Sequence, residues 1–197
     1  MASKMNKVTF PKQFPRLETE RLILRAVTPD DEQAVFRNFA DEAVVEHLME
    51  PFTTMKQAES IVAKFIATFE RGKGLFWAIT CKQDDAFIGT CRFESVEFGA
   101  LGEVGFDLAP SHWGQGLMSE ALRAVIRYGF ERLGLTKIEA FTSIHNARAV
   151  NLLKRLDFQV SGTQEEIYRF FLLRQDWGGT LELIEQRIEK KTDWTTD

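Results

Sequence analysis

The 197-residue sequence contains little cysteine and little histidine, which limits covalent cross-links and metal sites. Its two cysteines, Cys81 and Cys91, flank an expected hairpin turn at residues 83–86 that places neither directly opposite the other, so we expect no disulfide bond. The three histidines, at positions 47, 112 and 145, lie far apart and show no metal-ligand spacing with the cysteines. The sequence therefore predicts no metal site.

Long apolar runs and clusters of basic residues are also missing. No uncharged apolar stretch approaches the roughly 18 residues of a membrane-spanning helix, and residues 1–15 lack the continuous apolar segment of a signal peptide. We therefore expect a cytoplasmic protein with reduced thiols and no membrane partner. Lysine and arginine form no stripe in a chain of net charge -4, so nucleic acid is not an expected partner either.

Two familiar phosphate-binding motifs are absent as well. The chain has no Gly-x-x-x-x-Gly-Lys-[Ser/Thr] loop, and it has no Gly-x-Gly-x-x-Gly followed by an acidic residue about 20 positions later. Nucleotide hydrolysis and nicotinamide chemistry are therefore disfavoured.

The composition that remains is that of one ordinary globular domain, with 44% hydrophobic and 27% charged residues. Residues 1–16 carry lysines and prolines without periodicity and are expected to form a flexible arm, which leaves residues 17–178 for the domain. Apolar residues at helical spacing predict a helical tail over residues 179–197. Such a tail would pack back on the domain or pair with a second subunit in a homodimer.

Hydrophobic periodicity predicts the order of helices and strands within the domain. Helical spacing occurs near residues 28–40, 61–69, 122–133 and 149–156. Strands are expected near residues 22–24, 75–81, 87–93, 104–108, 138–144, 158–162 and 166–174. This order predicts an α/β fold of mixed α+β type, in which about four helices cover a mixed sheet of about seven strands.

A glycine-rich turn joins the strand that ends near Leu108 to the next helix. Gly114 and Gly116 let the backbone turn sharply and leave its N–H groups unobstructed, and the helix start adds unpaired donors and a positive dipole end. This combination suits an anion such as a pyrophosphate. A glycine pair before a helix also serves as a purely structural turn, so the turn alone leaves both roles open.

Five stretches of the chain resemble motifs of a known family. They are LETERLILR at residues 17–25, GFDLAP at 105–110, WGQGLMSEAL at 113–122, NARA at 146–149 and LKRLDF at 153–158. Together they resemble the GNAT superfamily, and more closely its branch of Rim-type protein N-terminal acetyltransferases. Residues 105–122 are similar to the coenzyme A loop of that family.

The resemblance implies a single GNAT domain with a mostly antiparallel sheet, and an acyltransferase that moves an acetyl group from acetyl-CoA directly to a primary amine. A protein N-terminal α-amino group is the favoured acceptor. Two alternatives stay open. One is a small-molecule amine, such as an antibiotic or a polyamine, and the other is a non-catalytic module that binds acyl-CoA.

The resemblance also implies which residues hold acetyl-CoA. A main-chain N–H at the strand end near Leu108 would bind the acetyl carbonyl as an oxyanion donor. Asn146 would hydrogen-bond the pantetheine arm or the thioester region, and by its chemistry it is also a candidate helix cap. Backbone N–H groups would hold the pyrophosphate along the turn, at Trp113, Gly114, Gln115, Gly116, Leu117, Met118 and Ser119.

The chain departs from the family pattern at four positions, one of which is Ala149, where the family often has serine. Met118 stands where the family often has glycine or alanine, and its long side chain is expected to point away from the phosphates. Leu153 stands where some members carry a tyrosine general acid. Asp157 replaces a glycine and is expected to adopt the left-handed backbone conformation, which aspartate enters more readily than most residues.

Acetyl transfer requires a group that accepts the amine proton. Glu103 is the first candidate, because it begins the strand before the loop and occupies the place of the general-base glutamate in the histone-acetylating branch. The alternative is an ordinary strand-end carboxylate. His145 would act directly or through water, or is simply an exposed histidine, and Ser143 would relay a proton or is simply a sheet hydroxyl. His112 is a weaker candidate.

Overall fold

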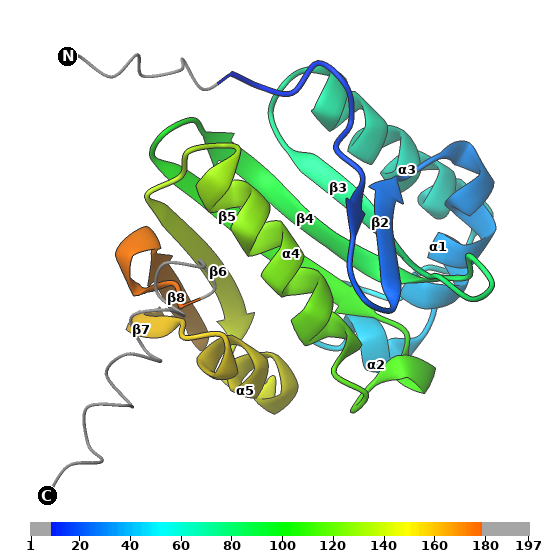
Figure 1. Ribbon diagram of the computed structural model, residues 1–197. Coiled ribbons are helices and arrows are strands. Elements are labelled where there is room, and N and C mark those ends of the chain that lie inside the picture. The colour runs from blue at the N-terminus through cyan, green and yellow to red at the C-terminus, as the bar shows by residue number, and fades with distance from the viewer. Residues whose placement is uncertain (1–8, 179–197) are drawn as a thin grey trace, which may run out of the picture.

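The computed structural model describes residues 9–178, and eight strands in this part of the chain form one sheet (Figure 1). The strand order is β1-β2-β3-β4-β5-β6-β8-β7, and every neighbouring pair is antiparallel except β5 and β6. The strands are β1 Leu17–Glu18, β2 Leu22–Ala26, β3 Leu75–Cys81, β4 Phe87–Glu97, β5 Leu101–Leu108, β6 Lys137–Ser143, β7 Gln159–Gln164 and β8 Ile167–Leu173.

Five α-helices flank the sheet in the described part of the chain. In Figure 1, α4 lies across one face, and α1 and α3 lie on the opposite face. Their bounds are α1 Glu32–Phe39, α2 Glu42–Val45, α3 Met55–Glu70, α4 Leu117–Glu131 and α5 Ala147–Arg155. Three short 3-10 helices in the described part of the chain lie at Pro29–Asp31, Pro110–His112 and Arg174–Asp176.

This architecture confirms the expected α/β class and exceeds the expected element count by one strand and one helix. The additional strand, β1, has two residues, and the additional helix, α2, has four. Neither is long enough to display a strand or helix period, so periodicity could not have identified them. The expected left-handed backbone at Asp157 is confirmed, with φ of 66°.

Alternation along β3 divides the hydrophobic interior into two cores. Leu75, Trp77 and Ile79 pack in the core that α4 and α5 cover. Phe76 and Ala78 point to the opposite face and pack in the smaller core beneath α1 and α3. Both faces of the sheet are therefore buried at β3, and the main core also holds one face of β4 and β5.

The described part of the expected N-terminal arm is packed against the domain. The Phe10 ring lies 5.2 Å from the Phe69 ring, and Phe14 contacts both Phe69 and Trp77. The indole N–H of Trp77 donates to the main-chain oxygen of Pro15 at 2.7 Å. Residues 9–16 thus cover the end of α3, in contrast to the expected flexible arm. Residues 1–8 and the expected helical tail over 179–197 lie outside the described residues.

The two cysteines do not face each other in the sheet. Cys91 pairs with Trp77 across β3 and β4, whereas Cys81 pairs with Leu22 of β2. Both thiols are free. Complete burial raises the pKa of Cys91 to about 12, so this thiol is a core residue with little nucleophilic character.

No helix within residues 9–178 is long and apolar enough to cross a membrane.

Gly129 tests how tightly α4 packs on the sheet. Alanine ordinarily stabilises a helix interior relative to glycine by about 1 kcal/mol. Here an added Cβ would lie only 2.7 Å from Cζ of Phe93, a fully buried ring, and 3.1 Å from Cδ1 of Leu135. We therefore expect Gly129→Ala to lower the free energy of unfolding by about 1–3 kcal/mol in urea denaturation. Combining it with Phe93→Leu should recover part of the loss, and strict additivity of the two changes would contradict this account.

Candidate functional site

The site originates where two parallel strands separate. β5 and β6 pair only from Leu101 opposite Lys137 to Glu103 opposite Glu139, although β5 continues to Leu108 and β6 to Ser143. Beyond these pairs the two strands no longer bond to each other, and a cavity of about 660 Å³ opens between them. Its walls come from β4 and β5, from the glycine-rich turn with the start of α4, from β6 with α5, and from α2.

The glycine-rich turn has the backbone conformation that the sequence predicts. Gly114 and Gly116 have φ of 74° and 76°, in the left-handed region that favours glycine. Gly116 is the N-cap of α4, so the first N–H groups of that helix lie directly after the turn. Gly114, Gly116 and Leu117 all line the cavity. An anion at this wall would therefore meet unobstructed backbone donors and the positive end of a 15-residue helix.

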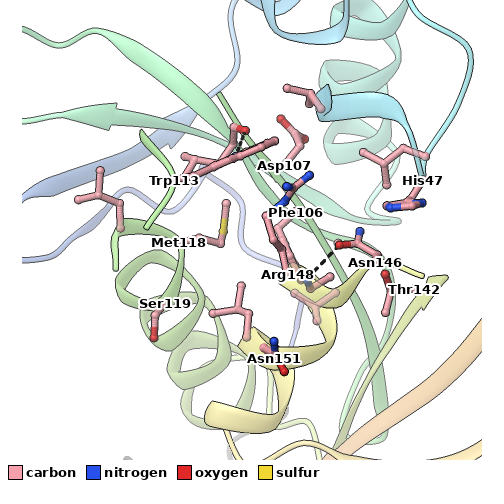
Figure 2. A pocket seen from close by; sticks show the side chains of 18 of the residues that line it. His47, Phe106, Asp107, Trp113, Met118, Ser119, Thr142, Asn146, Arg148 and Asn151 are labelled. Carbon is pink, nitrogen blue, oxygen red and sulfur yellow. Dashed lines mark hydrogen bonds between the residues drawn. The ribbon is translucent and has the colours of Figure 1, made fainter. Parts of the chain in front are cut away.

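Trp113 links this turn to the end of β5 and to α5. Its indole N–H donates to the Leu108 oxygen at 2.7 Å, and the Arg148 guanidinium stacks over its ring at 3.8 Å. Figure 2 shows these side chains around the cavity together with Met118 and Asn146. Met118 lines the cavity and also belongs to the main core, with an exposed fraction of only 8%.

The α5 wall is basic. Arg148 and Arg155 both line the cavity, and Asn151 and Leu152 lie between them on the same helix. These four positions follow the i, i+3, i+4, i+7 spacing of one helix face. The short helix therefore presents two guanidinium groups to the space that the glycine-rich turn also faces.

The opposite wall, formed by β4 and β5, is built around the buried carboxylate of Asp107. This group accepts hydrogen bonds from the Asn38 amide at 2.6 Å, from the Arg92 guanidinium at 3.1 Å, and from both the hydroxyl and the main-chain N–H of Thr90. Burial raises the pKa of Asp107, while Arg92 and Thr90 oppose the rise. The Asp107 carboxylate thereby holds Arg92 in place, and Arg92 also pairs with Glu94 at 2.9 Å.

Glu103 lies at the bottom of the split, at the last residue pair that joins β5 to β6. Its side chain lines the cavity beside Glu94. Burial raises the pKa of Glu103, the nearby charges of Glu94 and Glu139 raise it further, and Arg92 partly opposes them. A carboxylate with a raised pKa is a stronger base than an ordinary surface glutamate.

Asn146 caps α5 and also faces the cavity. Its side-chain oxygen accepts the main-chain N–H of Ala149 at 3.1 Å, which confirms the helix cap expected from its chemistry. The residue lines the cavity as well, so capping and ligand binding are compatible at this position.

The structure brings most of the sequence-predicted site residues to one cavity, but not all of them. Gln115 is not among the lining residues, and its side chain donates to the Ser111 oxygen. Ser143 and His145 also lie outside the lining: the Ser143 hydroxyl accepts the His145 main-chain N–H, and the His145 ring lies 3.6 Å from Glu166. The predicted residues that do line the cavity are Glu103, Leu108, Trp113, Gly114, Gly116, Leu117, Met118, Ser119 and Asn146, and the weaker candidate His112 lines it as well.

Sequence reasoning missed several charged residues of the cavity. Arg148 and Arg155 could have been found from their seven-residue spacing on a short helix. Arg92 and Glu94 carry no such signal, because alternation in a strand does not reveal what lies opposite. Within residues 9–178, no group of three or more histidine, cysteine, aspartate or glutamate side chains could hold a metal ion.

Comparison with known proteins places the chain beside acetyltransferases. The family described as "Acetyltransferase (GNAT) domain" matches residues 21–159. The protein named "Uncharacterized N-acetyltransferase YoaA" of Bacillus subtilis (strain 168) is 34% identical over 151 residues, which cover 76% of this chain and 85% of that protein. The [ribosomal protein uS5]-alanine N-acetyltransferase of Escherichia coli (strain K12) is 24% identical, over 82% of this chain and 86% of its own. The solved structure of Mycobacterium smegmatis RimJ in complex with CoA-disulfide superposes with a TM-score of 0.72 at 18% identity, over 81% of this chain and 87% of that one.

The electrostatics of Glu103 can be tested by titration. Its carboxyl should titrate above the ordinary glutamate value of 4.5 in a carbon-13 NMR experiment. Glu94→Gln removes a like charge and releases Arg92 from its partner, and both effects should lower the pKa of Glu103. Glu97→Gln, at the end of β4 and outside the cavity lining, serves as the control and should leave the titration unchanged. If the pKa of Glu103 is the same in Glu94→Gln as in the wild-type protein, the described arrangement is contradicted.

Proposed function

The chain belongs to the GNAT family of acetyltransferases, and on that premise we propose that it acetylates the N-terminal α-amino group of a protein. Acetyl transfer is the activity of the family, and the N-acetyltransferases among its relatives make the chain an acyltransferase. The choice of acceptor is supported by relatives named for acting on ribosomal proteins and by the shape and charge of the cavity.

One observation carries the proposal: a half-buried carboxylate, Glu103, lies at the bottom of a strand split that is also lined by the glycine-rich turn and the N-terminus of α4. The glycine-rich turn suits the pyrophosphate of coenzyme A. Arg148 and Arg155 on the α5 wall suit its remaining phosphate charge. The pantetheine arm would then extend between β5 and β6, which leaves the thioester near the middle of the split.

The end of β5 supplies a main-chain donor for the acetyl carbonyl. The Leu108 oxygen points to the Trp113 indole, whereas the N–H of the next residue, Ala109, donates in the opposite direction to Ile88 of β4. The N–H and C=O of a strand residue point the same way, so the Leu108 N–H faces the cavity side. It would stabilise the oxyanion that forms when the amine attacks the thioester.

The acceptor would approach from the wall formed by α2 and β6. His47 and Leu48 line this end of the cavity together with Phe141, and Leu48 and Phe141 are 43% and 46% exposed. Exposed apolar side chains at a cavity mouth suit the first side chains of a polypeptide. Glu94 and Glu103 give the nearby β4–β5 wall a negative charge, which favours the arrival of an ammonium group.

The proposed reaction uses Glu103 to take the proton of the amine. The neutral nitrogen attacks the thioester carbon, the carbon–sulfur bond breaks, and the leaving thiolate of coenzyme A takes up the second proton, which the nitrogen loses as the amide forms. An α-amino group, with a pKa near 7.7–8.0, demands less of a base than a lysine near 10.4. Ser143 and His145 are kept as secondary candidates that would act through water, and Asn146 would orient the thioester region.

An acceptor panel tests the proposal. With acetyl-CoA as donor, we expect turnover on peptides with a free N-terminus. We expect little on the same peptides with a blocked N-terminus and an internal lysine. Turnover should fall at least about tenfold in Glu103→Gln. A general base usually contributes about 10²–10⁴-fold, and water can replace part of that contribution. Turnover confined to polyamines or aminoglycosides would overturn the acceptor assignment. Coenzyme binding without turnover on any amine would indicate a non-catalytic module.

The donor site has its own test in Gly114. Its φ of 74° disfavours valine, and no atom within 4 Å would meet an added Cβ, so Gly114→Val disturbs the turn without a clash. Affinity for coenzyme A should fall about tenfold to thousandfold by calorimetry, because one or two charge-assisted hydrogen bonds are lost. Affinity for pantetheine, which lacks the phosphates, should change little.

Gly99 provides a matched control for this substitution. It has φ of 73° and equally open surroundings, but it lies in the turn between β4 and β5, outside the cavity lining. Gly99→Val should cost similar stability and leave both affinities intact. Equal weakening of coenzyme A and pantetheine by Gly114→Val would show that the turn does not hold the pyrophosphate.

A further inference from the structure

The glycine-rich turn is held from behind by an arginine that lies almost a hundred residues earlier in the chain. Arg21 lies in the turn between β1 and β2, where its main-chain oxygen accepts the N–H of Lys82 at 3.0 Å. Its guanidinium makes two kinds of contact with the donor wall. Nη1 donates to the Gln115 oxygen at 2.9 Å, and Nε and Nη2 each lie 2.7 Å from the Glu120 carboxylate.

The contact with Gln115 determines where the next N–H points. The described backbone contains no cis peptide bond, and in a trans peptide the C=O of one residue and the N–H of the next point in opposite directions. Because the Gln115 oxygen points to Arg21, the Gly116 N–H points away from it. Gly116 lines the cavity and Gln115 does not, so the direction away from Arg21 is the direction of the cavity.

The contact with Glu120 removes an unwanted charge from the anion site. Glu120 belongs to the first turn of α4, where a free carboxylate would repel a phosphate. Its side chain is instead turned away from the cavity and accepts hydrogen bonds from the Thr19 hydroxyl and from the main chain and side chain of Arg21. Burial raises the pKa of Glu120, but these bonds outweigh it and hold the pKa below the ordinary value. The carboxylate is therefore ionised and paired with Arg21 across the neutral pH range.

We propose that Arg21 is a positioning residue for the coenzyme A pyrophosphate: it aims the Gly116 N–H into the cavity and neutralises Glu120 behind the turn. This inference rests on the proposed donor site. It adds the turn between β1 and β2 to that site, although no residue of this turn lines the cavity. In the proposed donor site the acetyl end lies at β5, so the effect of Arg21 should be confined to the phosphate end.

The test compares two arginine variants with two ligands. Arg21→Met keeps the aliphatic stem and removes the guanidinium. By calorimetry, its affinity for coenzyme A should fall about ten- to hundredfold, while its affinity for pantetheine stays within about twofold of the wild-type value. In steady-state kinetics KM for acetyl-CoA should rise with kcat nearly unchanged. Arg21→Lys keeps the charge but lacks the fork that reaches both partners, so it should show a smaller loss of the same selectivity.

Arg25→Met is the matched control. Arg25 lies on β2 and forms a two-point contact with Asp31 at 2.8 and 2.9 Å, but it does not touch the glycine-rich turn. This variant should leave the ratio of the two affinities unchanged. The positioning role is overturned if Arg21→Met lowers the affinities for both ligands equally, or lowers neither. If Arg21→Met does not fold, the same criterion applies to Arg21→Lys. If the wild-type protein itself shows no preference for coenzyme A over pantetheine, the donor site of the proposed function fails instead.

Discussion

The chemistry of this protein depends on the early separation of two parallel strands. β5 and β6 share three residue pairs and then diverge, which leaves main-chain groups of both strands without a strand partner inside the domain. Backbone N–H and C=O groups away from water demand hydrogen-bond partners, so a split in a sheet is a natural binding site for a ligand with amide groups of its own. Pantetheine is such a ligand. One face of β4 and β5 is held in the main core through Cys91, Phe93, Val104 and Leu108.

The two walls of the split carry opposite charge, and they differ in how far their charged groups are buried. On the α5 wall, Arg148 and Arg155 are exposed, so they would attract the phosphates of the proposed donor at little desolvation cost. On the β4–β5 wall, Asp107 is fully buried and is stabilised only because Arg92, Thr90 and Asn38 all donate to it. This network fixes Arg92, which partly opposes the rise in the Glu103 pKa that burial and the charges of Glu94 and Glu139 cause. Base strength at this position is thus a property of the surrounding strands rather than of the glutamate alone.

Local features of the chain could be predicted because their causes are local. The helices α1, α3, α4 and α5 follow from a 3.6-residue period, and the longer strands follow from alternation. The left-handed conformations of Gly114, Gly116 and Asp157 follow from residue type and motif, and so does the cap that Asn146 provides for α5. The family resemblance added the donor and the reaction, and the match over residues 21–159 confirms the family.

Other features arise only when distant segments meet, and no local pattern encodes them. The pairing register of β5 and β6 decides that Glu103 lies at the bottom of the split, and packing decides that Ser143 and His145 lie outside the cavity lining. The pairing of Arg92 with Asp107, and of Arg21 with the turn before α4, joins residues whose spacing in the chain carries no periodic signal. Hydrophobic periods report which face of an element is buried, because burial acts on each element separately. Which charged groups meet across elements depends on the complete fold, since a shift of one residue in register would exchange every partner.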